Sequence, residues 1–242
     1  MPVGTLDINA IAAPTLFPSY PTSETFVFKD VTLAAVSYRV PAAQVAPLVP
    51  PELELEDEPL VTSTFVDYGM STVGIYTEFV QTVEATYNGR KFDYTLILVL
   101  DNEAAIFAGR EVYGYPKVFG KVGLDPNTGS RLITGFADRP AGRRVIDFDF
   151  IPEKVLPGLP PVEKRTLNLR VIPSPIPGNP PSIRQFVSVD MNMESPEVWI
   201  GQGSVSFPRK SVIDKWADFD ILRYEGAMLA KRCSASITAF EE

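Results

Sequence analysis

Residues 60–68 read LVTSTFVDY, residues 72–83 read TVGIYTEFVQTV, and residues 92–100 read FDYTLILVL. Short runs of β-branched and aromatic residues such as these are typical of β-strands. Asn88-Gly89 lies between the second and third runs, and this dipeptide favours the tight turn of a β-hairpin. Residues 60–100 therefore predict neighbouring antiparallel strands.

Glu78 lies within the second run. Alternation along a strand places its side chain on the same face as Tyr76 and Val80, and opposite Ile75 and Phe79. A carboxylate with apolar neighbours is either exposed at the surface or a buried acid. The strand pattern alone favours the exposed position.

The chain upstream of residue 60 continues the β pattern, with interruptions. Residues 1–28 contain Pro14, Pro18 and Pro21 and are expected to form an extended arm that packs on the body. Residues 32–40 predict a strand, and residues 41–45 predict a short helix with proline in its first turn. Residues 52–58 alternate glutamate and leucine, which predicts a strand with its carboxylates on a solvated face.

The chain downstream of residue 100 is also expected to be mainly β. Asp101 or Asn102 can cap a short helix over residues 103–108. The proline-rich connection 152–161 is expected to pack on the body, and Val212 and Trp216, four residues apart, favour a helix over 211–219. Further strands are expected near residues 131–136, 144–150, 167–172, 183–191, 198–207 and 221–240.

Composition limits the possible functions. The 242 residues contain no histidine and a single cysteine, Cys233, which excludes Ser-His-Asp and Cys-His catalysis and makes a zinc site improbable. The net charge of −8 argues against nucleic-acid binding, and no apolar run is long enough to cross a membrane. No lysine or arginine precedes Lys29, so no secretory signal is expected and a cytoplasmic protein is the simplest interpretation.

Residues 109–118 read GREVYGYPKV and place Lys117 in an apolar, aromatic setting after a proline. Such a lysine is most often the solvated tip of a turn. If it is buried, however, its ammonium form is disfavoured, and the neutral amine can attack a carbonyl carbon to form a Schiff base.

This stretch and its flank, residues 100–106, resemble the acetoacetate decarboxylase family. The resemblance extends over most of the chain, through residues 37–39, 57–61, 74–78, 87–89 and 197–201. It implies a single domain over residues 1–242 and an α+β fold dominated by antiparallel β-structure. It also implies a cone-shaped closed barrel, a few short peripheral helices, and a homo-oligomer.

The resemblance also implies roles for individual residues. Lys117 corresponds to the Schiff-base lysine at the bottom of a funnel, where the substrate is a small oxo acid and no metal or other cofactor is required. Glu78 corresponds to the active-site glutamate, which overturns the exposed position that the strand pattern favoured. Arg110 and Glu111 match a Gly-Arg-Glu element, for which an internal ion pair is the favoured interpretation and a substrate contact the alternative.

The remaining candidates are aromatic. Tyr113 and Tyr76 are candidate substrate-binding residues, and Glu111 and Tyr113 join Glu78 as candidates for proton transfer.

Three positions depart from the family pattern. Val118 replaces a second lysine, Val31 aligns with an arginine that faces the active-site glutamate, and Thr64 aligns with a second glutamate. The loss of these polar groups is expected to change what the cavity recognises.

Three functions follow from these residues. The first is decarboxylation of acetoacetate or a related β-keto acid through an iminium on Lys117. The second is aldol condensation and dehydration of pyruvate with an aldehyde, through the same lysine. The third is binding of a small ligand without reaction.

Overall fold

The computed structural model describes residues 1–6, 12–22, 25–160 and 164–242 of the chain. Its strands form a single twelve-stranded sheet in the order β1-β2-β3-β4-β9-β10-β12-β11-β8-β7-β6, with β5 on β4. The strands and α-helices are β1 (Val27–Arg39), α1 (Ala42–Val45), β2 (Leu60–Ser71), β3 (Tyr76–Tyr87), β4 (Arg90–Leu100), α2 (Glu103–Glu111), β5 (Lys117–Phe119), β6 (Lys121–Asp125), β7 (Ile133–Asp138), β8 (Arg144–Leu156), β9 (Thr166–Ile172), β10 (Ile183–Glu194), β11 (Glu197–Ser206) and β12 (Arg223–Glu241).

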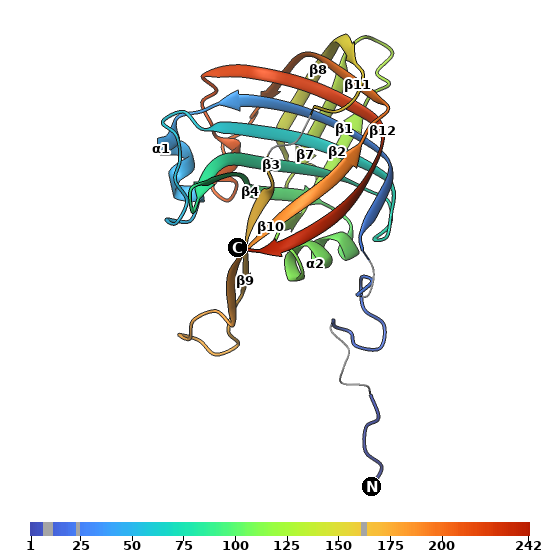
Figure 1. Ribbon diagram of the computed structural model, residues 1–242, viewed down its shortest axis with the longest axis vertical. Helices are drawn as coiled ribbons and strands as arrows, with labels where there is room; N and C mark the ends of the chain where they lie inside the picture. Colours follow the sequence, from blue (N-terminus) through green and yellow to red (C-terminus); the bar gives the residue numbers. More distant parts are fainter. Residues whose placement is uncertain (7–11, 23–24, 161–163) are drawn as a thin grey trace.

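The sheet closes on itself because β12 pairs with β1 as well as with β10 and β11. The ladder β1-β2-β3-β4-β9-β10-β12 therefore returns to its first strand, and β10 and β12 cross in front of β2–β4 (Figure 1). Pairing is antiparallel except where β4 meets β5 and β9. The predicted fold, dominated by antiparallel β-structure with short helices, is confirmed.

The predicted hairpin joins β3 to β4. Asn88 and Gly89 have φ values of 49° and 74°, the left-handed conformations that this tight turn requires. The hairpin places Glu84 opposite Asp93. An irregularity between Gln81 and Thr82 then shifts the register by one residue, so that Glu78 lies opposite Leu100.

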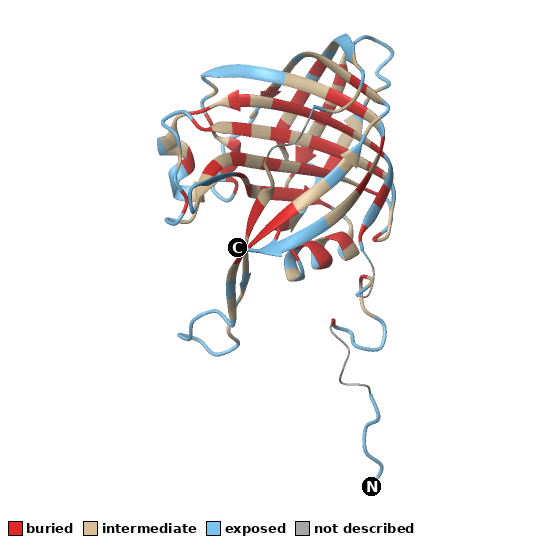
Figure 2. Ribbon diagram, in the orientation of Figure 1, coloured by how far each residue is buried: buried red, intermediate tan, exposed pale blue. Residues whose placement is uncertain are grey.

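Alternate residues of β2 and β3 belong to two separate apolar clusters, one on each face of these strands. Figure 2 shows the buried positions along the strands. Phe65 and Phe79 point to one face, where the ring of Phe65 lies 5.2 Å from that of Phe148 in β8. Val66 and Tyr68 point to the other face, inside the closed ladder, toward α2, β10 and β12. This second face holds the candidate site.

Residues 52–58 and residues 211–219 differ from their predicted structure. Residues 52–58 form a loop with one isolated bridge, Glu54 to Thr86, instead of a strand. Residues 211–219 contain only a short 3-10 turn at Lys215–Ala217, and Val212 is exposed whereas Trp216 is buried.

The predicted connection after residue 150 is partly a strand. β8 continues through Pro152 to Leu156 and pairs with β11. Leu156 and Leu159 pack, as expected, against the apolar cluster inside the closed ladder, which we call the inner apolar cluster. Val155 is exposed.

Within the described residues, none of the helices has the length and apolar character needed to span a bilayer.

Candidate active site

Lys117 is buried inside the closed ladder, with only 7% of its surface exposed. It begins β5, whose parallel pairing with β4 sets Lys117 beside Leu98. Its Nζ lies 2.7 Å from Oε1 of Glu78, which is 2% exposed and comes from the facing part of β3. A buried amine and a buried carboxylate therefore form one ion pair.

Tyrosine rings surround this pair. Nζ of Lys117 lies 5.7 Å from the ring centre of Tyr76 and 5.8 Å from that of Tyr115, which are cation–π distances. The Tyr68 hydroxyl donates a long hydrogen bond of 3.4 Å to Oε2 of Glu78. Two aromatic rings thus lie near the ammonium group, and the Tyr68 hydroxyl binds the carboxylate.

Burial keeps these phenols protonated. It raises the pKa of Tyr115 to about 12, and burial together with the nearby Glu78 charge raises the pKa of Tyr68 and Tyr76 well above the ordinary value. Each phenol is therefore a hydrogen-bond donor across the physiological pH range.

Gly109 of α2 makes room for the stem of Lys117. A Cβ atom at this position would lie 2.5 Å from both Cδ and Cε of Lys117. The helix itself begins where Asn102 caps it by accepting a hydrogen bond from the Ala105 amide. The cap and the glycine together let α2 lie directly against the lysine.

Three side chains hold the backbone around Lys117. Arg110 donates from Nη1 to the Lys117 carbonyl at 3.0 Å. Asn168 and Arg170, both of β9, donate to the carbonyls of Tyr113 and Glu111 at 3.1 and 2.6 Å. The segment between α2 and β5 is therefore fixed at each end and near its middle.

A cavity of about 280 Å³ opens beside Lys117. Its walls come from β1–β4, α2, β10, β12 and the segment that leads to β5. Among the described residues that line it, only Lys117, Glu78 and Asp93 carry a charge. The others are Phe26, Phe28, Leu33, Thr62, Thr64, Val66, Tyr68, Val73, Tyr76, Val80, Thr82, Leu98, Ala105, Ala108, Gly109, Tyr113, Tyr115, Thr166, Met191, Met193 and Ile237.

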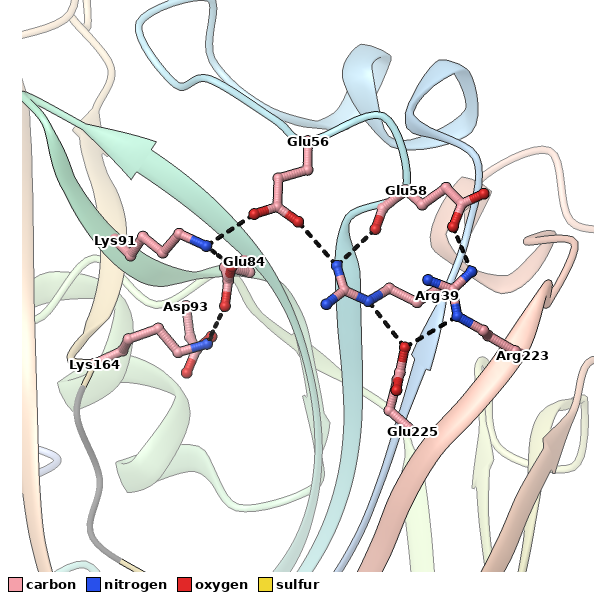
Figure 3. A network of polar contacts seen from close by, with 9 residues as sticks. All are labelled: Arg39, Glu56, Glu58, Glu84, Lys91, Asp93, Lys164, Arg223 and Glu225. Carbon is pink, nitrogen blue, oxygen red and sulfur yellow. Dashed lines mark hydrogen bonds and ion pairs between the residues drawn. The ribbon is translucent and has the colours of Figure 1, made fainter.

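Asp93 bounds the end of the cavity that lies away from α2, because it is near the start of β4 and α2 follows the end of that strand. Lys164 lies 3.2 Å from Asp93 and also contacts Glu84. Burial raises the pKa of Asp93, while the Lys164 charge opposes that shift. Figure 3 shows this pair joined through Lys91 to a larger network of charged residues.

The network crosses the rim of the ladder. Lys91 contacts Glu56, which also pairs with Arg39 of β1 at 3.0 Å, and Arg39 reaches Glu225 of β12 at 3.2 Å. Glu56 and Glu58 of the 52–58 loop thus form ion pairs with residues of the neighbouring strands (Figure 3).

The structure brings together four of the predicted site residues and separates two. Lys117, Glu78, Tyr76 and Tyr113 all line the cavity. Glu111 does not line it: its carboxylate accepts a 2.6 Å hydrogen bond from the Tyr20 hydroxyl outside the cavity.

The interpretation of Arg110 and Glu111 as an internal ion pair is not supported. Their side chains have different partners, since Arg110 is an exposed residue whose guanidinium binds the Lys117 carbonyl. Arg110 therefore contacts the backbone of the site and lies outside the lining of the cavity.

The three departures from the family pattern have different surroundings. Thr64 lines the cavity, and Val31 is fully buried in the inner apolar cluster. Val118 is partly buried against the outer apolar cluster, on the opposite side of the strand from Lys117.

Sequence reasoning missed several residues that shape the site. Tyr68, Asn168 and Arg170 lie in strand patterns that could not show which face meets Lys117. Gly109 could be read as a turn residue, but the structure places it within α2. Only the path of the lysine stem shows why that position must lack a side chain.

No group of three or more potential metal-binding side chains is present in the part of the chain that the structure describes. The chemistry available at the site is that of the amine, the carboxylate and the phenols.

Comparison with known proteins places this geometry in a family. The family model described as acetoacetate decarboxylase matches residues 11–235. The chain is 38% identical over 206 residues to "Decarboxylase DEC1" of Cochliobolus heterostrophus, which covers 83% of this chain and 81% of that protein. Acetoacetate decarboxylase of Clostridium botulinum is 36% identical over 121 residues, about half the length of each protein.

Solved structures share the fold. A structure of acetoacetate decarboxylase superposes with a TM-score of 0.84 at 23% identity and covers 97% of this chain and 96% of its own. The enduracididine biosynthesis enzyme MppR complexed with pyruvate superposes with a TM-score of 0.75 at 18% identity, with 91% of each chain covered. With the match over residues 11–235 and the identity to DEC1, these findings show that the chain belongs to the acetoacetate decarboxylase family.

Proposed function

We propose that this protein is a decarboxylase that holds a β-keto acid covalently, as a Schiff base on Lys117. The observation that carries the proposal is the buried pair of Lys117 and Glu78, at 2.7 Å, on the wall of a mainly apolar cavity. Removal of the amine from water favours its neutral, nucleophilic form, and the carboxylate in contact with it can accept the proton that it loses. Membership of the acetoacetate decarboxylase family supports the same chemistry.

The first step needs a neutral amine and a carbonyl. Glu78 is placed to take the ammonium proton of Lys117, because Oε1 and Nζ are in contact. The free amine then attacks the keto carbon, and the carbinolamine loses water to give the iminium. Glu78, now protonated, can return its proton to the departing hydroxyl.

The second step breaks the bond between the α-carbon and the carboxylate. The electron pair of that bond moves toward the iminium nitrogen, which gives an enamine and carbon dioxide. The α-carbon of the enamine takes up a proton, and water hydrolyses the resulting iminium to the ketone and free Lys117. Apolar walls favour this step, because the charged carboxylate becomes a neutral gas as it leaves.

The charge of the cavity favours decarboxylation over the aldolase alternative. In an aldol condensation of pyruvate the carboxylate persists through every step and needs a stable cationic partner. Lys117 is the only cationic residue among the described residues that line the cavity, and after it forms the iminium its charge belongs to the reacting group and is lost in the enamine. A leaving carboxylate needs no such partner.

The test is release of carbon dioxide from acetoacetate by the wild type and by Lys117→Arg. The arginine variant keeps a positive charge beside Glu78, so the buried carboxylate is not left unpaired. We expect turnover by the wild type and a loss of roughly 10³-fold or more in the variant, with its circular dichroism unchanged. Equal activity in the two proteins would refute the role of Lys117, and binding without turnover would favour a non-catalytic protein.

A further inference from the structure

The charged groups on the cavity wall are already paired. Lys117 contacts Glu78 at 2.7 Å, and Asp93 contacts Lys164 at 3.2 Å. A second charged group on a substrate would therefore find no free partner among the described lining residues. Away from the reacting carboxylate, the substrate is expected to be uncharged.

Two of the four threonines that line the cavity have hydroxyl groups that are already hydrogen-bonded within the protein. The hydroxyl of Thr62 exchanges a 2.8 Å hydrogen bond with Ser37, and that of Thr166 donates to the Val189 carbonyl at 3.0 Å. With these hydroxyls used inside the protein, each side chain can present its methyl group to the cavity. This part of the wall accepts apolar atoms without leaving those two hydroxyls unpaired.

A wall of flexible apolar side chains bounds the cavity on β10 and β12. Met191 and Met193 are two residues apart and so lie on one face of β10, and Met191 pairs across the ladder with Ile237 of β12. All three are partly buried hydrophobic residues packed on the inner apolar cluster. Methionine adapts its shape to irregular apolar partners, which suits contact with an alkyl chain.

The cavity is larger than acetoacetate needs. Its volume of about 280 Å³ is enough for roughly nine waters at their liquid volume of about 30 Å³ each. Acetoacetate has seven non-hydrogen atoms, and covalently bonded atoms occupy less space than separate waters. A longer acid therefore fills space that acetoacetate leaves open.

From these observations we infer that the preferred substrate is a β-keto acid whose acyl chain is longer than that of acetoacetate by at least two methylene groups, with the added carbons packed against Met191, Met193 and Ile237. The inference rests on the proposed decarboxylation and names the class of acid that the same site takes. Lys117 and Glu78 carry out the reaction, and the methionine wall selects the chain.

The test compares acetoacetate, β-ketohexanoate and β-ketodecanoate as substrates of the wild type. Each buried methylene group favours binding by about fourfold, so kcat/KM for β-ketohexanoate should exceed that for acetoacetate by roughly fifteenfold. Equal kcat/KM for all three acids, or a fall with chain length, would overturn the inference.

Met191→Gln tests whether the alkyl chain of the substrate contacts the methionine wall. It puts an amide of similar length into the apolar wall, and we expect it to lower the ratio of kcat/KM between β-ketohexanoate and acetoacetate at least threefold. Asn192→Gln is the matched control, because Asn192 is exposed and its side chain points to the other face of β10. The control should leave the ratio unchanged.

Borohydride trapping distinguishes failure of the chain-length inference from failure of the proposed decarboxylation. If both acids label Lys117 but kcat/KM for acetoacetate equals that for β-ketohexanoate, the chain-length inference is overturned and the decarboxylase proposal stands. If the series gives the expected ratio but Met191→Gln leaves it unchanged, the assigned wall is wrong. If neither acid labels Lys117 or is turned over, the proposed function fails and the inference fails with it.

Discussion

Substitution of Gly109 by alanine should separate catalysis from stability. Gly109 lies in α2, where it directly faces the stem of Lys117. The new Cβ would lie 2.5 Å from Cδ and Cε of the lysine, whereas carbon atoms pack at about 3.5–4.0 Å. The lysine stem must therefore move by about 1 Å.

The effect on stability should be small. The atoms that must give way belong to a flexible side chain beside a cavity of about 280 Å³, so the lysine can move without moving the backbone. Alanine is also a better helix former than glycine, by about 0.8–1.0 kcal/mol in a helix interior. We expect the free energy of unfolding to change by less than about 1 kcal/mol in either direction, on the scale of that helix preference.

The effect on the reaction should be large. A displacement of about 1 Å at the reacting group can cost roughly 10²-fold in rate, because the amine no longer meets the keto carbon and Glu78 together. We therefore expect kcat for carbon dioxide release to fall about 100-fold in Gly109→Ala. Urea unfolding followed by circular dichroism would measure stability in the same preparation.

Gly226→Ala is the matched control. Gly226 lies exposed in β12, and a Cβ atom there would have no atom within 4 Å. This variant should keep wild-type kcat. If Gly109→Ala instead retains kcat within threefold, the position of Lys117 against α2 is not the one used in catalysis, and the reasoning from this contact is refuted.

Three further predictions concern groups in and near the site. Glu78→Gln removes the proton acceptor of Lys117, so kcat for carbon dioxide release should fall by about 10²- to 10⁴-fold, and a loss below threefold would contradict that role. Burial raises the pKa of Tyr113 and Tyr115 to about 12, so these phenols ionise in the unfolded chain before they do so in the folded protein. Stability should therefore fall as pH rises above about 10, and urea unfolding at stepped pH should show a smaller fall for Tyr115→Phe. Cys233 is fully buried, and burial raises its pKa; a chromogenic disulfide should label it slowly in the folded protein and rapidly in urea, and fast labelling without urea would contradict that burial.

The strands around the site could be predicted from local sequence because the strand pattern and the turn residues indicate the same structure. Residues 60–100 combine β-forming runs with an Asn-Gly turn, and the structure places β2, β3 and β4 there. Alternation also put Tyr76, Glu78 and Val80 on one face, and all three line the cavity. It could not show whether that face was buried, because burial depends on strands far away in the sequence.

The helix predicted over residues 211–219 shows how side chains can outweigh a short helical pattern. The hydroxyl of Ser211 accepts a hydrogen bond from the Asp214 amide and donates one to the Asp214 carboxylate. Asp214 also forms an ion pair with Arg139, next to β7. The bond from the Asp214 amide to Ser211 is of the kind that caps a helix, so the difference lies in the ion pair, which ties Asp214 to a distant residue that local spacing cannot show.

The site itself depended on the family resemblance and on contacts over long distances in the chain. The residues alone gave Lys117 little weight, and Glu78 was first interpreted as exposed. Their contact at 2.7 Å arises because β5 adds to β4 while β3 lies on the other side of that strand. The same resemblance points to Arg110 and Glu111, but neither lines the cavity: Arg110 binds the Lys117 carbonyl, and Glu111 binds the Tyr20 hydroxyl.

Mass spectrometry after borohydride reduction tests the central claim most directly. The wild type and Lys117→Arg would be incubated with acetoacetate, reduced, and digested to locate any adduct. The account predicts a stable adduct on the wild-type peptide that contains Lys117 and none on the corresponding peptide of the variant. Turnover of acetoacetate with no adduct on Lys117, or an adduct on a different lysine, would contradict it.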